Sequence, residues 1–305
     1  MDTFKGKTAF ITGGASGIGL ALAQECCKEG MNVVIADIRQ SALDEAMPVF
    51  EKNNWPVLAT VLDVTDREAY EKAADEAEAK FGKIHLLVNN AGIGCARGPL
   101  WEVSYAQTDL ALNLNLTAVL TGIQVVVPRI LKHGESGYIV NTASKAALIA
   151  VPSCGLYNLT KQALVSLSET LATDLHGTNV GACVFCPGPF TSSLGQTSGE
   201  IEGLFLGTET KAPPPPPRPG VDMEAYAKLQ RPASDAAKRI LRGIKRGDMY
   251  IITHSEFKDG FKERVDAMLR AFPDEEQNEK FKEVFSFLVT NPVFNRQTAV
   301  PALEE

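Results

Sequence analysis

The chain has 305 residues, of which 45% are apolar, and a formal net charge of −7. This is enough to bury a large core in one α/β domain or two smaller ones. The acidic balance argues against nucleic acid or an anionic membrane as a partner, because both attract basic surfaces. No apolar run approaches the ~18 residues of a membrane span, and the first predicted strand begins too early to leave room for a signal peptide. We therefore expect a soluble, cytoplasmic protein.

The six cysteines favour a reducing compartment over a disulfide framework. Cys183 and Cys186 form a C-x-x-C pattern, but they lie in an apolar run that predicts a buried strand. Residues three apart on a strand face opposite sides, so we expect core thiols there. The four histidines are scattered, and no His/Cys group has metal-ligand spacing. No metal site is predicted.

Short apolar runs alternate with amphipathic helical patterns as far as about residue 190. The predicted strands are Thr8–Ile11, Asn32–Ala36, Val57–Leu62, Ile84–Val88, Tyr138–Asn141 and Val180–Phe185. The predicted helices are Ile18–Glu29, Gln40–Lys52, Arg67–Phe81, 105–131 and 155–176. This alternation predicts an α/β fold with a doubly wound parallel sheet, the Rossmann fold. Its ligand crevice lies beyond the carboxyl ends of the strands.

The pattern divides the chain into three parts, a core of residues 1–192, a proline-rich substrate loop of 193–232, and a C-terminal part of 233–305. The loop contains Pro213–Pro217, which predicts a stiff polyproline II segment. It is interpreted as the edge of a lid, or as a ligand for an SH3-like domain through Pro213-x-x-Pro216-x-Arg218.

The third part returns to regular structure. It contains a helix with Ser234 as its N-cap and the strand Met249–Thr253, which complete the core. Two charged amphipathic helices are then predicted within residues 256–290.

A glycine-rich turn from Thr12 to Gly19 joins the first strand to the first helix. Gly13 permits the sharp turn, Gly17 lets the backbone approach a pyrophosphate, and Gly19 allows close packing of helix on strand. With Ser16 and Ile18, these residues are the candidate phosphate site, because a helix N-terminus attracts anions. An ordinary strand–helix connection is the alternative.

Asp37 ends the second predicted strand, 18 residues after Gly19. A carboxylate there accepts hydrogen bonds from the adenine-ribose hydroxyls of NAD and repels the 2′-phosphate of NADP. Arg39 points the other way, because a guanidinium can hold that phosphate. NAD is the predicted cofactor, with NADP as the alternative.

Tyr157 and Lys161 are four residues apart and share one face of a predicted helix. A nearby ammonium stabilises a phenolate, which lowers a pKa that is ordinarily near 10. Ser144 follows the strand Tyr138–Asn141 and therefore belongs at the crevice. Tyr-x-x-x-Lys alone is common on solvated helices. Its combination with Ser144 predicts acid–base chemistry.

With these residues together, the chain resembles the short-chain dehydrogenase/reductase family over about residues 5–192. Beyond the turn, Asp37, Ser144, Tyr157 and Lys161, the resemblance rests on further family motifs. These are Asp63-Val64 after the third strand, Asn89-Asn90-Ala91-Gly92 after the fourth, Asn115 in a helix, and Pro187-Gly188 followed by Phe190 and Thr191.

The resemblance implies catalytic roles for Asn115, Ser144, Tyr157 and Lys161, and cofactor binding by the other motifs. Asn113 competes with Asn115. The resemblance also implies a homodimer or homotetramer formed through the helices at 105–131 and 155–176. The apolar strip Leu164, Leu167 and Leu171 is assigned to that interface or to the core.

Two positions depart from the family pattern. His85 stands where aspartate is common and is interpreted as structural. Lys145 follows Ser144 where a small residue is usual, and it either favours a polar substrate or points outward.

The implied activity is NAD(P)-dependent interconversion of a secondary alcohol and a ketone. Substrate selection is expected from Ile93–Leu100, Lys145–Cys154 and the 190–232 segment, whose apolar residues suit a medium-sized hydrophobic or aromatic substrate. The tail loosely resembles family members that oxidise benzylic alcohols of lignin-derived aryl ethers. A non-redox cyclase or isomerase and a cofactor-binding regulatory module are the alternative functions.

Overall fold

The architecture comes from a computed structural model, which describes residues 1, 3–207 and 222–301. The run Pro213–Pro217 and the proposed Pro213-x-x-Pro216-x-Arg218 ligand lie outside the described residues. Both interpretations of that segment therefore stay predictions.

Seven parallel strands form one sheet in the order β3-β2-β1-β4-β5-β6-β7. Their bounds are β1 Thr8–Thr12, β2 Asn32–Asp37, β3 Val57–Val61, β4 Leu86–Asn89, β5 Gly137–Thr142, β6 Val180–Cys186 and β7 Tyr250–Ile252. The chain runs outward from β1 in both directions, so the strand order reverses between β1 and β4. The doubly wound fold is confirmed, and such a reversal is where ligands bind.

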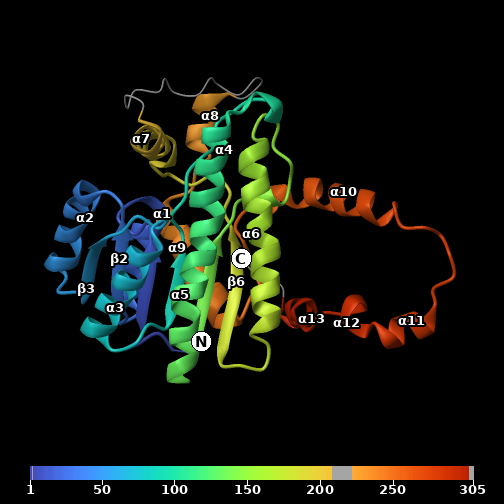
Figure 1. Cartoon of the computed structure of the whole chain (residues 1–305), viewed down its shortest axis with the longest axis horizontal. Helices are drawn as coiled ribbons and strands as arrows, with labels where there is room; N and C mark the ends of the chain where they lie inside the picture. Colours follow the sequence, from blue (N-terminus) through green and yellow to red (C-terminus); the bar gives the residue numbers. More distant parts are fainter. Residues whose placement is uncertain (2, 208–221, 302–305) are drawn as a thin grey trace.

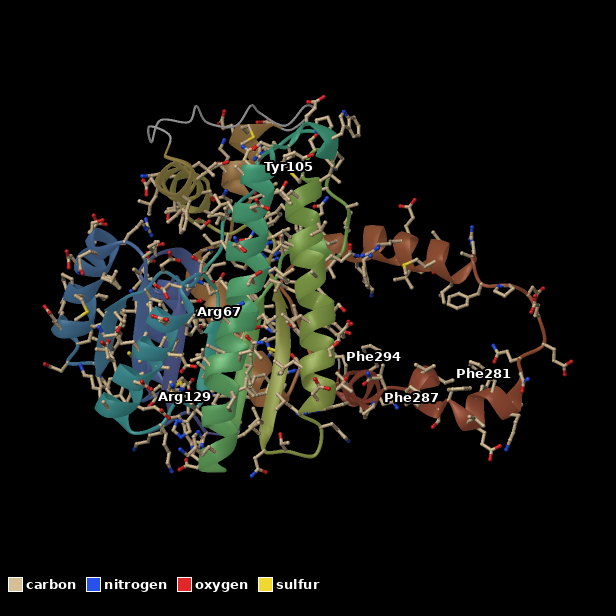
Figure 2. The ribbon with its side chains drawn as sticks, in the orientation of Figure 1. Arg67, Tyr105, Arg129, Phe281, Phe287 and Phe294 are labelled. Carbon is tan, nitrogen blue, oxygen red and sulfur yellow. The ribbon has the colours of Figure 1, made fainter. Side chains whose placement is uncertain are left out.

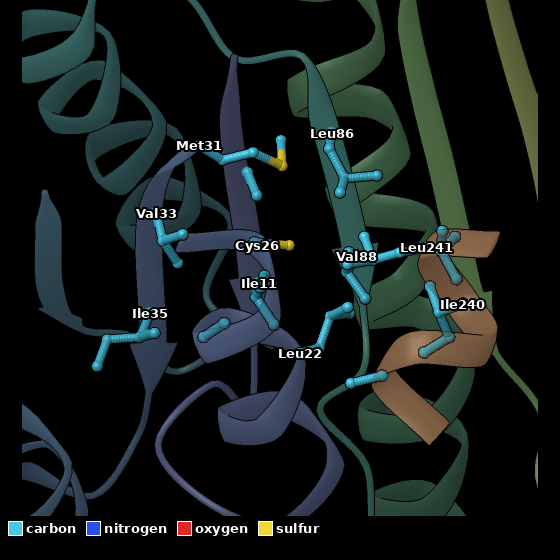
Figure 3. Packing of buried hydrophobic residues seen from close by; sticks show 14 of the residues in the cluster. Ile11, Leu22, Cys26, Met31, Val33, Ile35, Leu86, Val88, Ile240 and Leu241 are labelled. Atoms are coloured by element: carbon cyan, nitrogen blue, oxygen red, sulfur yellow. The ribbon is translucent and has the colours of Figure 1, made fainter. Parts of the chain in front are cut away.

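Helices cover both faces of the sheet (Figure 1). One face carries α1 (Gly17–Lys28), α2 (Gln40–Lys52) and α9 (Ala233–Arg246). The other carries α3 (Arg67–Phe81), α5 (Ala118–His133) and α6 (Gly155–Asp174). In Figure 3, Leu22 and Cys26 of α1 pack beside Ile11, while Ile240 and Leu241 of α9 cover Val88. Burying each such aliphatic side chain stabilises the fold by about 1.5–3 kcal/mol.

The cysteine prediction is confirmed for the pair on β6. Cys183 and Cys186 are both buried free thiols, and they belong to different core clusters. Cys183 faces the α1 and α9 side, whereas Cys186 faces α6. No disulfide can join two thiols held on opposite faces of a strand.

The helix predicted at 105–131 contains an irregularity. It consists of α4 (Tyr105–Leu112), a π-helical stretch (Asn113–Thr117) and α5, which together span 29 residues. Its length and apolar composition would suffice to cross a membrane. In its most apolar window 61% of the residues are buried, and α5 packs on the sheet, so it is a core helix.

Two predictions for the segment between β6 and α9 were wrong. The segment expected to be irregular forms α7 (Leu194–Leu206) and α8 (Met223–Lys228). Glycines within α7 hide its apolar spacing. Helix α9 begins at Ala233 with Pro232 as its N-cap, because Pro232 already has extended backbone (φ −65°, ψ 145°), and Ser234 lies inside the helix.

The tail holds more and shorter helices than the two predicted. They are α10 (Lys258–Leu269), α11 (Glu279–Val284), α12 (Ser286–Val289) and α13 (Pro292–Ala299). Pro273 disfavours helix in the residue before it, and Phe285 leaves the helical region between α11 and α12. Figure 1 shows the tail leaving the body along α10 and returning beside α6 through α13.

Candidate active site

A crevice opens beyond the carboxyl ends of the central strands, at the reversal of strand order. It brings together most of the predicted cofactor and catalytic residues. These lining residues are Gly13, Ser16, Gly17, Ile18, Asp37, Arg39, Asp63, Val64, Asn90, Ala91, Gly92, Tyr157, Lys161 and Pro187.

The glycine-rich turn has the geometry that its three glycines predict. Gly13 and Gly17 have φ of +61° and +52°, a region that favours glycine. A Cβ on Gly19 would lie 2.1 Å from the Gly13 carbonyl oxygen, so α1 can approach β1 only without that side chain. Helix α1 begins at Gly17, at the crevice, where its N-terminal N–H groups favour a phosphate.

Asp37 and Arg39 lie together in the crevice. The Asp37 carboxylate is buried and accepts hydrogen bonds from the Arg39 backbone N–H (3.2 Å) and Nε (3.3 Å). Arg39 Nη2 also donates to Ser16 Oγ at 3.2 Å. The guanidinium therefore bridges the carboxylate and the glycine-rich turn.

Asn90 ties the end of β4 to the turn after β1. Its Nδ2 donates to the carbonyl oxygens of Thr12 (3.0 Å) and Gly13 (3.2 Å). Thr12 Oγ1 accepts from the backbone N–H groups of Asn90 and Ala91. A Cβ on Gly92 would lie 2.9 Å from Asn115 Oδ1 and 3.4 Å from Lys161 Nζ. The space beside Gly92, after the end of β4, is therefore open only because this residue has no side chain.

Tyr157 and Lys161 lie one turn apart on α6 and both face the crevice. Lys161 Nζ lies 5.6 Å from the centre of the Tyr157 ring and donates to the Thr142 carbonyl oxygen at 3.0 Å. Ser144, which follows β5, is buried and hydrogen-bonds to Tyr157. The three side chains therefore form one connected group at a strand end.

Burial controls the acidity of both groups on α6. It raises the pKa of Tyr157 to about 12, while the hydrogen bond to Ser144 lowers that pKa in part. Burial lowers the pKa of Lys161 to about 8. The net depression of the Tyr157 pKa that was expected is not seen, because desolvation outweighs the lowering expected from the Lys161 ammonium.

Asn115 lies in the π-helical stretch and is fully buried, whereas Asn113 is exposed. The Asn115 side chain accepts from the Ile93 N–H (2.8 Å) and donates to the Ile93 carbonyl oxygen (3.0 Å). Of the two candidates, only Asn115 borders the catalytic group. π-Helical turns are frequent at functional sites.

The segment after β6 is hydrogen-bonded to the residue that follows β7. Gly188 N–H donates to Thr253 Oγ1 at 3.0 Å, and the Lys145 N–H donates to the Pro187 carbonyl oxygen at 2.9 Å. A Cβ on Gly188 would meet the ring of His254. These roles of Thr253 and His254 were not predicted, because both residues follow β7 and lie more than 60 residues after this segment.

Four residues predicted for the cofactor are not among the lining residues of the crevice, namely Gly19, Gly188, Phe190 and Thr191. The Phe190 ring packs into the core against His254, with ring centres 5.4 Å apart. Thr191 N–H bonds to the Arg231 carbonyl oxygen at 2.9 Å. Of the four residues predicted in this segment, Pro187 is the one that lines the crevice.

Helix α7 closes one side of the crevice and was missed from the sequence. Glu200 lies 3.5 Å from Arg39 Nη1, and Ser198 Oγ accepts from the Gly94 N–H at 2.8 Å. Ile201 packs with Ile93 and Leu114. The spacing of Leu194, Ser198 and Ile201 is a weak helical signal that could have revealed it.

The two departures from the family pattern have separate explanations. His85 accepts the Thr8 N–H at Nδ1 (3.1 Å) and pairs with Glu135 through Nε2 (3.2 Å), away from the crevice lining. Its structural interpretation is confirmed. Lys145 is partly buried, with Nζ 4.9 Å from the centre of the Phe257 ring, so it does not simply point outward.

This fold and crevice define a class, the doubly wound dinucleotide-binding proteins. The family model for short chain dehydrogenases matches residues 7–202. Cα-dehydrogenase from Sphingobium sp. (strain NBRC 103272 / SYK-6) is 30% identical over 276 residues, 88% of this chain and 87% of that protein. The chain therefore belongs to the short-chain dehydrogenase family.

Solved structures agree. A short chain dehydrogenase/reductase from Burkholderia phymatum in complex with NAD is 32% identical, covers 91% of this chain and all of its own, and has a TM-score of 0.77. A short chain dehydrogenase from Burkholderia cenocepacia J2315 in complex with NADP is 25% identical, covers 82% and 95% of the two chains, and has a TM-score of 0.67. Both nicotinamide cofactors thus occur among similar structures.

Proposed function

We propose that the protein interconverts a secondary alcohol and a ketone with a nicotinamide cofactor, and that Tyr157 is the acid–base group. The observation that carries this proposal is the connected group of Ser144, Tyr157 and Lys161 beside a crevice with a glycine-rich turn. The proposed substrate is a medium-sized hydrophobic or aromatic compound. Dehydrogenases among the relatives support the redox class.

The residues present fit a dinucleotide. The backbone of the turn from Gly13 to Gly19 would hold its pyrophosphate, Asp37 its adenine ribose, and Lys161 its nicotinamide ribose. Gly13 and Gly92 leave the crevice open where a Cβ would obstruct it. When bound, the nicotinamide ring supplies the carbon that accepts or donates hydride.

The chain's own residues handle the proton and the orientation of the substrate. During oxidation, the Tyr157 phenolate removes the proton from the substrate hydroxyl, and during reduction the phenol returns it. Ser144 hydrogen-bonds the same substrate oxygen and fixes its position. With a pKa of about 8, Lys161 is largely protonated at neutral pH and stabilises the phenolate.

A screen of secondary alcohols and ketones with NAD(H) and NADP(H) tests this function. We expect net change in NADH absorbance with aryl or alkyl substrates of medium size. Replacing Tyr157 by Phe should lower kcat by about 10²–10⁴-fold or more, with cofactor affinity nearly unchanged. Tyr105→Phe, at an exposed position, is the control.

An active Tyr157→Phe enzyme would refute the role of the phenol. Turnover without net change in NADH would instead favour a cyclase or isomerase. Cofactor binding without turnover of any substrate would favour a regulatory module.

We further propose that NAD is preferred over NADP. The buried Asp37 carboxylate supports this preference, because it would repel a 2′-phosphate. Arg39 already pairs with Asp37, so Asp37→Ala should free its guanidinium for that phosphate. We expect the ratio of kcat/KM for NAD over NADP to fall by about 10–100-fold. Unchanged selectivity would contradict the proposed role of Asp37.

A further inference from the structure

The C-terminal arm, defined as residues 258–291, exposes a large apolar surface. In Figure 2 it stands away from the body, with Phe281 far from the body and Phe287 between Phe281 and Phe294. Phe272 and Phe287 are 73% and 72% exposed. Its exposed large apolar residues are Phe261, Met268, Leu269, Phe272, Phe281, Val284, Phe285, Phe287, Leu288 and Val289. Isolated exposed apolar residues are ordinary, but a set this large in one segment marks an interaction surface.

Both ends of the arm are fixed to the body. Near its start, Arg264 Nη1 donates to the carbonyl oxygens of Ala147 (3.1 Å) and Leu148 (3.2 Å). At its end, Asn291 Nδ2 donates to Thr173 Oγ1 at 3.0 Å, and the buried Val293 packs with the α6 core. With both ends attached, the apolar residues between these anchors stay exposed on the single chain and are available to another molecule.

The charges of the arm favour a protein partner over a lipid surface or nucleic acid. The arm has six basic and eight acidic residues, including the acidic run Asp274–Glu276. Several of these charges pair along their own helices, as in Lys262 with Asp266 and Lys282 with Glu279. A surface of this kind lacks the basic excess that anionic membranes attract.

We propose that the arm docks on a second copy of this chain. At the exposures above, and with about 150–200 Å² for each large apolar side chain, the arm offers on the order of 1,000 Å². A stable interface needs about 800 Å² from each partner. In a two-fold dimer the same surface of each copy takes part in the interface, so both arms are buried.

This contact differs from the interface expected through α6. Leu164 of the apolar strip is fully buried, and Leu167 and Leu171 pack partly against the core, so the strip serves the core of its own chain. The arm is thus the larger unpartnered apolar surface. The proposal does not depend on the oxidoreductase activity.

Sedimentation velocity of the full chain over a range of concentrations tests the proposal. We expect a reversible oligomer for the wild type. The variant Phe281→Ser/Phe287→Ser/Leu288→Ser should raise the subunit dissociation constant at least about 100-fold. The control, Val61→Ser/Met223→Ser/Leu229→Ser, replaces exposed apolar residues outside the arm and should leave that constant unchanged.

Hydrogen exchange of the wild type keeps the test valid if the arm variant fails to fold. Amides of residues 270–290 should become protected as the protein concentration rises. The proposal would be overturned by a wild type that stays monomeric or by an arm variant with an unchanged dissociation constant. It would also be overturned if the protection of these amides did not change with protein concentration. A monomer that binds phosphatidylcholine vesicles through the arm would likewise overturn it.

Discussion

The strand ends of the core and the segments after β6 build the same crevice in different ways. In the core, Asp37, Asn90 and Ser144 each end a strand or follow one within two residues, so local sequence places them at one edge of the sheet. After β6, Glu200 meets Arg39, 161 residues away, and Arg264 meets Ala147, 117 residues away. The first region holds the predicted catalytic and cofactor residues, and the second closes around them.

The largest expected difference between the two regions is the loss of cofactor affinity when a glycine is replaced by alanine. Gly19→Ala would place a Cβ 2.1 Å from the Gly13 carbonyl oxygen, which forces α1 away from the turn. We expect the NADH dissociation constant to rise at least about 100-fold, with a loss of about 1–3 kcal/mol in the free energy of unfolding. Fluorescence titration and thermal unfolding measure the two effects.

Gly195→Ala is the matched control in α7, because an added Cβ there meets nothing within 4 Å. It should leave cofactor affinity unchanged. Similar losses of affinity in both variants would show that the two regions do not differ as argued.

Per pH unit, a smaller effect is expected on the rate of oxidation, and it separates the proposed chemistry of the core from the closing segments. Oxidation needs deprotonated Tyr157, whose pKa burial raises to about 12. Below that pKa the phenolate fraction grows tenfold per pH unit, so kcat/KM for oxidation should rise with pH with a slope near one. Reduction needs the phenol, so kcat/KM for reduction should be independent of pH over the range in which kcat/KM for oxidation rises.

Steady-state rates of oxidation and reduction, from about pH 6 to about pH 9, measure these two pH dependences. Oxidation that is independent of pH across this range would rule out Tyr157 as the base of a rate-determining proton transfer.

The smallest expected effect lies at the root of the tail. Arg264→Gln weakens the bonds to the carbonyl oxygens of Ala147 and Leu148, in the turn after Ser144. Hydrogen bonds to charged groups contribute about 1.5–3 kcal/mol each, and part of this should be lost. We expect KM for the alcohol to rise about 3–10-fold, with KM for the cofactor unchanged.

Lys262→Gln is the control, since Lys262 pairs with Asp266 on the surface of α10. An Arg264→Gln variant whose cofactor KM rises instead would contradict the separation of the two regions.

Sequence reasoning succeeded where periodicity and strand ends decide position. The sheet, the turn and the placement of Tyr157 and Lys161 at the crevice follow from local patterns. The inward direction of Phe190 could not be predicted, because the ring that it packs against, His254, comes from the segment after β7. Helix α7 was missed because its glycines weaken the helical pattern, while contacts to Arg39 and Gly94 hold it in place. Burial of Tyr157, and hence its raised pKa, likewise depends on the assembled crevice.

The π-helical stretch at Asn113–Thr117 has a consequence for insertions and deletions. Each residue of an α-helix turns the chain by about 100°, so the extra residue of a π turn sets the phase between α4 and α5. Leu110 of α4 thereby packs with Ile201 of α7, while Val126 of α5 faces the sheet. Removing one residue from the stretch would rotate one half against the other. A single-codon deletion there would misalign Asn115 even though every named side chain remained in the sequence.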